Sequence, residues 1–152
     1  MPFDPHVMLN ASTLLYSSRN ASRCPMPVSN KPTILVVDNH ADFVETLGHL
    51  LSSAGHKSFG ATTGLDAILV FKQHHSEIDL LLVDVVMPEM SGPELLDCLR
   101  SLKSDLKVLF MSGYDRQTVS AVRGFSWNHP FIQKPFEATA LQKKISLICH
   151  PS

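Results

Sequence analysis

Asp79-Leu-Leu-Leu-Val-Asp84 is the stretch of this sequence that decides the fold. Its four apolar residues stand between two acids, which is typical of a short strand whose two faces are both buried. Strands of this kind belong to parallel sheets that helices cover on both sides. The segment therefore predicts a central parallel strand with a carboxylate, Asp84, at its carboxyl end.

Apolar strands alternate with helical patterns on both sides of this segment. Further strands are expected at residues 33–38, 57–62, 106–111 and 130–133. Helices are expected at residues 41–54, 63–74, 94–102, 115–124 and 137–148. Repeated strand–helix pairs predict an α/β fold, here a doubly wound five-stranded parallel sheet with helices on both faces.

The composition excludes several classes of protein. Of 152 residues, 44% are hydrophobic and 18% are charged, so the chain can bury a core. The net charge of -1 provides no basic field for nucleic acid. The longest apolar run, 67–71, is far shorter than the roughly 18 residues of a membrane span. Three distant cysteines, Cys24, Cys98 and Cys149, fit neither a disulfide framework nor a zinc site, and they favour a reducing, cytoplasmic location.

The chain divides near residue 32. Half of its ten prolines fall within residues 1–32, and this stretch shows no sustained hydrophobic periodicity. We therefore expect residues 1–31 to form a disordered or extended tail and residues 32–150 to form one domain. A targeting peptide is the weaker interpretation, because Pro2 and Pro5 oppose an amphipathic helix at the N-terminus.

Side chains that can support chemistry follow four of the predicted strands. Asp38 and Asn39 follow the first strand, Asp84 ends the third, Ser112 the fourth, and Lys134 follows the fifth. Sites in doubly wound sheets gather at these carboxyl ends. Carboxylate and amide oxygens suit Mg²⁺, while a hydroxyl and an ammonium can meet phosphoryl oxygens. Asp84 ends the most buried strand and is the predicted nucleophile, since a carboxylate can form an aspartyl-phosphate.

Four motifs together resemble the receiver domain of two-component response regulators over about residues 32–150. They are Ile34-Leu-Val-Val-Asp-Asn39, Leu82-Val-Asp-Val-Val-Met-Pro88 followed by Gly92, Val108-Leu-Phe-Met-Ser-Gly113 and Phe131-Ile-Gln-Lys-Pro-Phe136. Each motif alone is weak evidence, but their order and spacing within an alternating pattern are specific. The resemblance implies a flavodoxin-like fold of the receiver type.

The resemblance also implies roles for single residues. Asp84 would be the phosphoacceptor, Asp38 a member of the acidic pocket, and Ser112 the hydroxyl that contacts the phosphoryl group. Lys134 would pair with the phosphoryl oxygens, and its bond to Pro135 would be cis.

A metal and a switch are implied in the same way. Mg²⁺ would be held by Asp38, Asn39, Asp84 and the backbone carbonyl of Val86. Phe131 stands at the position of the switch aromatic, which moves inward when the Ser112 hydroxyl is drawn toward the phosphoryl group.

Asn39 departs from the family pattern, in which a second acid follows the first strand. An amide oxygen can bind Mg²⁺ but brings no charge, so we expect weaker metal binding and slower phosphorylation. The departure also supports an alternative, a pseudo-receiver that binds partners without being phosphorylated.

Val86 and Tyr114 occupy positions that flank the path of attacking water in the receivers that this sequence resembles. An apolar and a bulky side chain there should hinder hydrolysis, so we expect slow autodephosphorylation.

Each motif residue also has a purely structural interpretation. Asp38 and Asp84 could cap the helices that follow them, Ser112 could belong to a plain turn, and Lys134 to a surface loop. Phe131 fits ordinary core as well as it fits a switch. Their combination, rather than any single residue, favours a phosphoryl site.

Two other residues are interpreted structurally. His40 is expected to be a solvated neighbour of the acidic pocket. Trp127 is expected to cap the rim of the core from a loop.

The leading hypothesis is a phosphoacceptor that catalyses only its own phosphorylation and dephosphorylation and is not otherwise an enzyme. Its phosphodonor would be a histidine kinase or a histidine phosphotransfer protein. The length leaves no room for a DNA-binding output domain, so we expect a free-standing protein whose target is another protein. The sequence does not distinguish this from a fragment of a longer protein, and it leaves open whether the protein forms a homodimer. A small phosphohydrolase is disfavoured, because Val86 replaces the second acid that such an enzyme needs.

Overall fold

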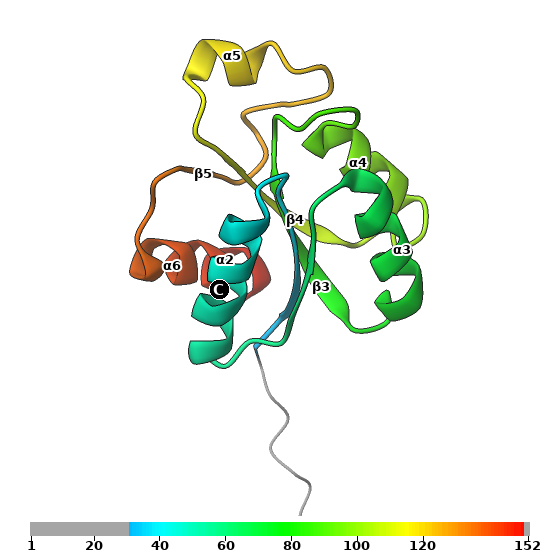
Figure 1. Cartoon of the computed structure of the whole chain (residues 1–152), viewed down its shortest axis with the longest axis vertical. Helices are drawn as coiled ribbons and strands as arrows, with labels where there is room; N and C mark the ends of the chain where they lie inside the picture. Colours follow the sequence, from blue (N-terminus) through cyan, green and yellow to red (C-terminus); the bar gives the residue numbers. More distant parts are fainter. Residues whose placement is uncertain (1–30, 151–152) are drawn as a thin grey trace, which may run out of the picture. The chain divides into compact units, whose positions relative to one another are not determined.

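The structure, a computed structural model, describes residues 31–150, which form a five-stranded parallel sheet in the order β2-β1-β3-β4-β5 (Figure 1). Its strands are β1 (Thr33–Val37), β2 (Ser58–Ala61), β3 (Ile78–Asp84), β4 (Lys107–Ser112) and β5 (Phe131–Gln133). The doubly wound, flavodoxin-like fold is therefore confirmed. The predicted tail and Cys24 lie outside the described residues, apart from Lys31, and the tail stays a prediction.

Helices cover both faces of the sheet, with α2 and α6 on one side and α3 and α4 on the other (Figure 1). The helices are α2 (Ala41–Ser53), α3 (Gly64–His74), α4 (Gly92–Arg100), α5 (Arg116–Ser120) and α6 (Ala138–Cys149). Within the described part of the chain, no helix combines the length and the apolar character needed to cross a membrane.

Two hydrophobic cores fill the spaces between the sheet and its helices. In β1, Ile34 and Val36 face α2 and α6, whereas Leu35 and Val37 face α3 and α4. Because successive side chains of a strand alternate between its faces, both faces are buried only if nearly every residue is apolar. This explains the continuous apolar stretches in the sequence. Each fully buried Leu, Ile or Phe contributes about 1.5–3 kcal/mol.

The predicted helix boundaries agree with the structure to within one residue except in α4 and α5. α4 starts at Gly92 rather than at residue 94, because Ser91 and Glu94 form a capping box and Pro93 is tolerated in the first turn. It ends at Arg100 rather than at residue 102. α5 ends at Ser120 rather than at residue 124. Its short sequence contains Thr, Val and Ser, which are weak helix formers, so packing decides where it stops.

The strand order changes direction at β1 and β3: the chain runs from β1 outward to β2 at one edge and then crosses back over β1 to β3 on its other side. A crevice at the carboxyl ends of strands with this order is the usual place of a binding site. Asp38 follows β1 directly and Asp84 is the last residue of β3, so both lie at this position.

Candidate functional site

Two carboxylates and one ammonium meet at the carboxyl edge of the sheet. Lys134 Nζ lies 2.5 Å from Asp38 Oδ2 and 3.0 Å from Asp84 Oδ2. The side chain of Asp38 is fully buried, that of Asp84 is 6% exposed and that of Lys134 is 17% exposed. Residues separated by 96 and 50 positions in the chain are thus brought together, as the sequence predicted.

Backbone amides fix the orientation of both carboxylates. The His40 N–H donates to Asp38 Oδ1 at 2.9 Å, and the Val86 N–H donates to Asp84 Oδ1 at 3.1 Å. Each carboxylate therefore has one oxygen held by the loop that follows its own strand. The other oxygen of each is left to face Lys134.

Burial and ion pairing shift the three titrations in different directions. Burial raises the pKa of Asp84, and the hydrogen bond from Lys134 offsets this only in part. Burial also disfavours ionised Asp38, but the hydrogen bonds from Lys134 and from the His40 N–H outweigh it and lower the pKa of that carboxyl. The pKa of Lys134 is raised despite burial, because it bonds both acids. Asp38 and Lys134 therefore form the firmly charged pair.

The loop after β3 passes so close to Asp84 that it requires glycine at residue 92. A Cβ on Gly92 would lie 2.5 Å from the backbone oxygen of Asp84. The Gly92 N–H donates to the Val85 carbonyl at 3.0 Å, and the Val85 N–H donates to the Met111 carbonyl at 2.9 Å. These contacts hold the backbone beside Asp84 against β4.

Ser112 and Lys134 lie side by side at the ends of β4 and β5. The Lys134 N–H donates to the Ser112 carbonyl at 2.9 Å. The Ser112 side chain is fully buried, and its Oγ accepts the Tyr114 N–H at 3.0 Å. The bond from Lys134 to Pro135 is cis, as the resemblance implied.

Phe131, at the start of β5, packs against two other aromatic rings. Its ring lies 6.0 Å from that of Phe125 and 5.0 Å from that of Trp127, between centroids. Trp127 is partly buried on the core and donates its indole N–H to Ser120 Oγ at 2.8 Å. The prediction that Trp127 caps the core is confirmed. The half-buried position of Phe131 is compatible with both interpretations of this residue, as part of the ordinary core and as a switch aromatic.

Two residues contact the site more closely than the sequence indicated. The His40 side chain is 71% exposed, as expected of a solvated neighbour, yet its Nδ1 lies 3.0 Å from Asp38 Oδ1. Phe43 of α2 lies beneath the ammonium, with Lys134 Nζ 4.4 Å from the centre of its ring. The contact of His40 with Asp38 is suggested by the sequence, because the two residues are only two positions apart. The contact of Phe43 with Lys134 has no signal in the sequence, because it depends on where α2 packs.

The donor atoms at this edge are chemically suited to Mg²⁺. The carboxylates of Asp38 and Asp84, the exposed amide of Asn39 and the backbone carbonyl of Val86 supply only oxygen, which hard divalent cations prefer. Among residues 31–150, no group of three or more His, Cys, Asp or Glu side chains is arranged as a metal site. The candidate set is therefore short of charge, with Asn39 where a third acid would complete it.

Comparisons with known proteins agree on one family. The sequence profile described as the response regulator receiver domain matches residues 34–146. The sensor kinase CckA of Brucella abortus is 34% identical over 115 residues, which are 75% of this chain and 12% of that kinase. The chemotaxis protein CheY of Treponema pallidum is 23% identical over 129 residues, 81% of this chain and 90% of that protein.

A solved receiver domain from a hybrid histidine kinase CckA superimposes with a TM-score of 0.64 at 28% identity. The match covers 78% of this chain and 99% of that domain. The chain thus spans a small part of the sensor kinase and nearly the whole of the isolated receiver domain.

Proposed function

Because the chain belongs to the family of response regulator receiver domains, we propose that Asp84 accepts a phosphoryl group from a phosphohistidine of a partner protein. The donor would be a histidine kinase or a histidine phosphotransfer protein. The product would alter the contacts of this domain with a downstream protein target. We place this signalling step in the cytoplasm, and we propose no catalysis beyond phosphorylation and dephosphorylation of the domain itself.

The observation that carries this proposal is the convergence of Asp38, Asp84 and Lys134 on one point. A structural ion pair needs only one acid for one ammonium, whereas here two buried carboxylates share Lys134 Nζ at 2.5 and 3.0 Å. Such an arrangement carries the free-energy cost of burying two like charges close together, and functional sites commonly carry a cost of this kind.

In the proposed reaction, an Asp84 carboxylate oxygen attacks the phosphorus of the phosphohistidine. The new P–O bond forms as the P–N bond breaks, and the electron pair of that bond returns to the imidazole nitrogen of the donor. The result is an acyl phosphate on Asp84. Lys134 has three N–H donors, so it can keep Asp38 while it turns from Asp84 Oδ2 to an oxygen of the phosphoryl group.

Members of this family generally bind Mg²⁺ at the phosphorylation site. In this chain Asp38, Asn39, Asp84 and the Val86 carbonyl would hold the ion, with reduced affinity because Asn39 brings no charge. When bound, the ion neutralises negative charge on the transferring group. The Val86 N–H and the Lys134 ammonium orient the nucleophile independently of the metal.

The proposed readout begins at Ser112. Its Oγ accepts only the Tyr114 N–H among the described residues, so the hydroxyl proton is available to a phosphoryl oxygen. Movement of Ser112 toward that oxygen would draw the loop at Tyr114 and open space for Phe131, whose ring now lies against Trp127. Phe131 would then be the switch that a partner protein senses.

The test is incubation with a small phosphodonor, such as acetyl phosphate, in the presence of Mg²⁺. Asp84→Asn is compared with wild type and with Asp97→Asn, an exposed acid of α4. We expect the mass of one phosphoryl group on wild type and on Asp97→Asn, and none on Asp84→Asn. Label that persists in Asp84→Asn would contradict the assignment of the phosphoacceptor.

One specific feature supports a second candidate, a pseudo-receiver that binds its partners without phosphorylation. Asn39 removes a charge from the acidic pocket, and Lys134 already contacts both remaining carboxylates. The same experiment separates the candidates, because a pseudo-receiver gives no label on wild type. Repeated turnover of the phosphodonor would instead indicate a phosphohydrolase.

A further inference from the structure

Lys134 is the side chain of the candidate site that has to change partners during the proposed reaction. Before transfer its ammonium lies 2.5 Å from Asp38 Oδ2 and 3.0 Å from Asp84 Oδ2. Once Asp84 carries a phosphoryl group, its carboxylate is no longer a free anion, and Asp38 is the one acid left to hold the ammonium. A further group that keeps the ammonium in place without occupying one of its N–H donors would therefore assist the transfer.

Phe43, in the first turn of α2, is placed to be this group. Lys134 Nζ lies over the face of its ring, 4.4 Å from the ring centre. The face of an aromatic ring carries partial negative charge and attracts a cation within about 6 Å. Unlike a carboxylate or a hydroxyl, the ring leaves the N–H donors of the ammonium available to oxygen acceptors.

Burial makes this contact stronger than the other cation–ring contacts within residues 31–150. The cations of Lys57 and Arg116 also lie over aromatic rings, but both side chains are exposed to solvent. The Lys134 side chain is only 17% exposed. A ring attracts a cation more strongly when the cation has lost most of its hydration. The contact between Lys134 and Phe43 is therefore the one strong enough to influence a reaction.

Short connections fix the ring relative to the acidic pocket. The His40 N–H donates to Asp38 Oδ1 at 2.9 Å, and the His40 carbonyl accepts the Phe43 N–H at 3.1 Å. The ring also packs edge to face on Phe136, with centroids 6.1 Å apart and an angle of 74° between the planes. The loop after β1 and the loop after β5 thus hold the ring, and the same two segments carry Asp38 and Lys134.

We propose that Phe43 is a positioning residue for phosphoryl transfer, whose ring holds the Lys134 ammonium while Lys134 exchanges Asp84 Oδ2 for a phosphoryl oxygen. This inference rests on the proposed function, because it concerns the same site. The ring acts through Lys134, since it supplies no oxygen or nitrogen ligand of its own. Its contribution is larger in the transition state than in the resting site, where two carboxylates already hold the ammonium.

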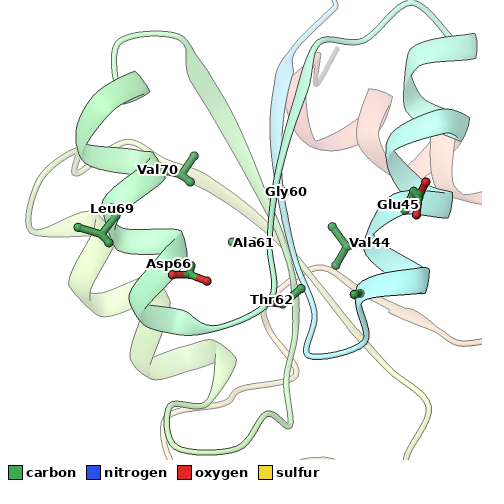
Figure 2. Close-up of a pocket in the computed structure, with 9 residues that line it drawn as sticks. Val44, Glu45, Gly60, Ala61, Thr62, Asp66, Leu69 and Val70 are labelled. Atoms are coloured by element: carbon green, nitrogen blue, oxygen red, sulfur yellow. The ribbon is translucent and has the colours of Figure 1, made fainter.

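Val44 offers a matched control on the same turn of α2. It follows Phe43 directly, is also partly buried and packs against the same hydrophobic core. Its side chain points toward the edge strand β2, where it meets Gly60 (Figure 2). Truncation of Val44 therefore removes packing from this turn of the helix and leaves the contact between Phe43 and Lys134 in place.

The test is the rate of phosphorylation of Asp84 by acetyl phosphate in the presence of Mg²⁺, followed by mass. Phe43→Leu keeps an apolar side chain without a ring and should lower the rate constant about tenfold, equivalent to about 1.4 kcal/mol. Phe43→Tyr should keep most of the rate, and Val44→Ala should leave it unchanged. Phenylalanine with increasing numbers of ring fluorine atoms at position 43 should lower the rate stepwise, because fluorine weakens the negative charge of the ring face at nearly constant shape.

A second readout does not depend on phosphorylation. The ring should shift the NMR signals of the Lys134 ε-methylene group upfield, and these signals are identified by their absence from Lys134→Met. The upfield shift should persist in Phe43→Tyr and in Val44→Ala and should disappear in Phe43→Leu.

The outcomes separate a failure of this inference from a failure of the proposed function. A wild-type chain that takes no label on Asp84 overturns both. A wild-type chain that is labelled, at a rate that ring fluorination leaves unchanged, overturns the role of Phe43 alone. A rate in Val44→Ala as low as that in Phe43→Leu does the same, because lost packing of α2 then explains the effect. Absence of the upfield shift from wild type also rejects the proposal, since it removes the contact on which the role of the ring depends.

Discussion

Replacement of Lys134 by methionine isolates the contribution of the ammonium that two buried acids share. Methionine keeps an unbranched side chain of similar length, so the contact with the ring of Phe43 remains apolar. What the variant removes is the positive charge within 2.5 Å of Asp38 and 3.0 Å of Asp84. We expect the free energy of unfolding to fall by about 2–4 kcal/mol.

The magnitude follows from two limits. One charge pair at 3.0 Å is worth roughly 5 kcal/mol at an effective dielectric constant of about 20. The loss is capped, however, because Asp84 can take up a proton. Protonation costs about 1.4 kcal/mol for each unit by which the pH lies above the pKa of the carboxyl. Burial has already raised the pKa of Asp84, which lowers this cost. Protonation of a carboxyl of ordinary pKa at pH 7 therefore costs about 4 kcal/mol, which sets the upper bound.

Equilibrium unfolding in urea measures this loss, and Lys144→Met on the exposed face of α6 is the matched control. The control should change the free energy of unfolding by less than about 0.5 kcal/mol. Adding Asp84→Asn to Lys134→Met removes one of the two unpaired acids and should recover about 1 kcal/mol or more. The reasoning is refuted if Lys134→Met is as stable as the control, or if the two substitutions have additive effects.

Three further predictions concern other residues. Asn39→Asp should tighten Mg²⁺ binding about tenfold, or about 1.4 kcal/mol, in calorimetric titration, and an unchanged constant would reject the role of the missing charge. Replacement of both Val86 and Tyr114 by small polar residues should shorten the half-life of phosphorylated Asp84, measured by loss of label; an unaltered half-life counts against hindrance of water. His56→Leu should lower the free energy of unfolding by about 2 kcal/mol in urea, because buried His56 bonds the Pro32 carbonyl and Gln142 Oε1 at 3.0 and 2.9 Å. A loss below about 0.5 kcal/mol would show those bonds to be replaced by water.

The strands were predictable because their pattern depends on burial alone. β1 and β3 lie in the middle of the sheet, and their nearly continuous apolar sequences follow from two covered faces. α5 was predicted too long, because its length depends on tertiary contacts that a five-residue helix of weak formers cannot override. The predicted start of α4 at residue 94 is wrong, because proline opposes the interior of a helix but Pro93 is compatible with the first helical turn.

The convergence of Asp38, Asp84 and Lys134 was predictable for a different reason. In a parallel sheet every strand ends at the same edge, so Asp38 and Asp84, which lie at the ends of the neighbouring strands β1 and β3, must be close. Lys134 follows β5 at the same edge, and its long side chain reaches past the end of β4 to both acids. The contacts from Phe43 and from the His40 ring were not predictable, because they depend on the packing of α2 and on a side-chain rotamer. The position of β2 at the edge of the sheet was also not predictable, since an edge strand is identified only once the strand order is known.

The charge balance of the site connects Asn39 to the chemistry of Asp84. With Asp38 and Asp84 ionised and Lys134 protonated, the three groups carry two negative charges and one positive charge, so their sum is -1. A second acid at residue 39 would make that sum more negative and would favour a divalent cation. Lys134 already contacts one oxygen of each carboxylate, so the ammonium would compete with a bound Mg²⁺ for the negative charge of the two acids. With Asn39 in place of an acid, both carboxylates would therefore favour contact with Lys134, and under the proposed function the negative charge of a phosphoryl group on Asp84 would raise the affinity of the site for the metal again.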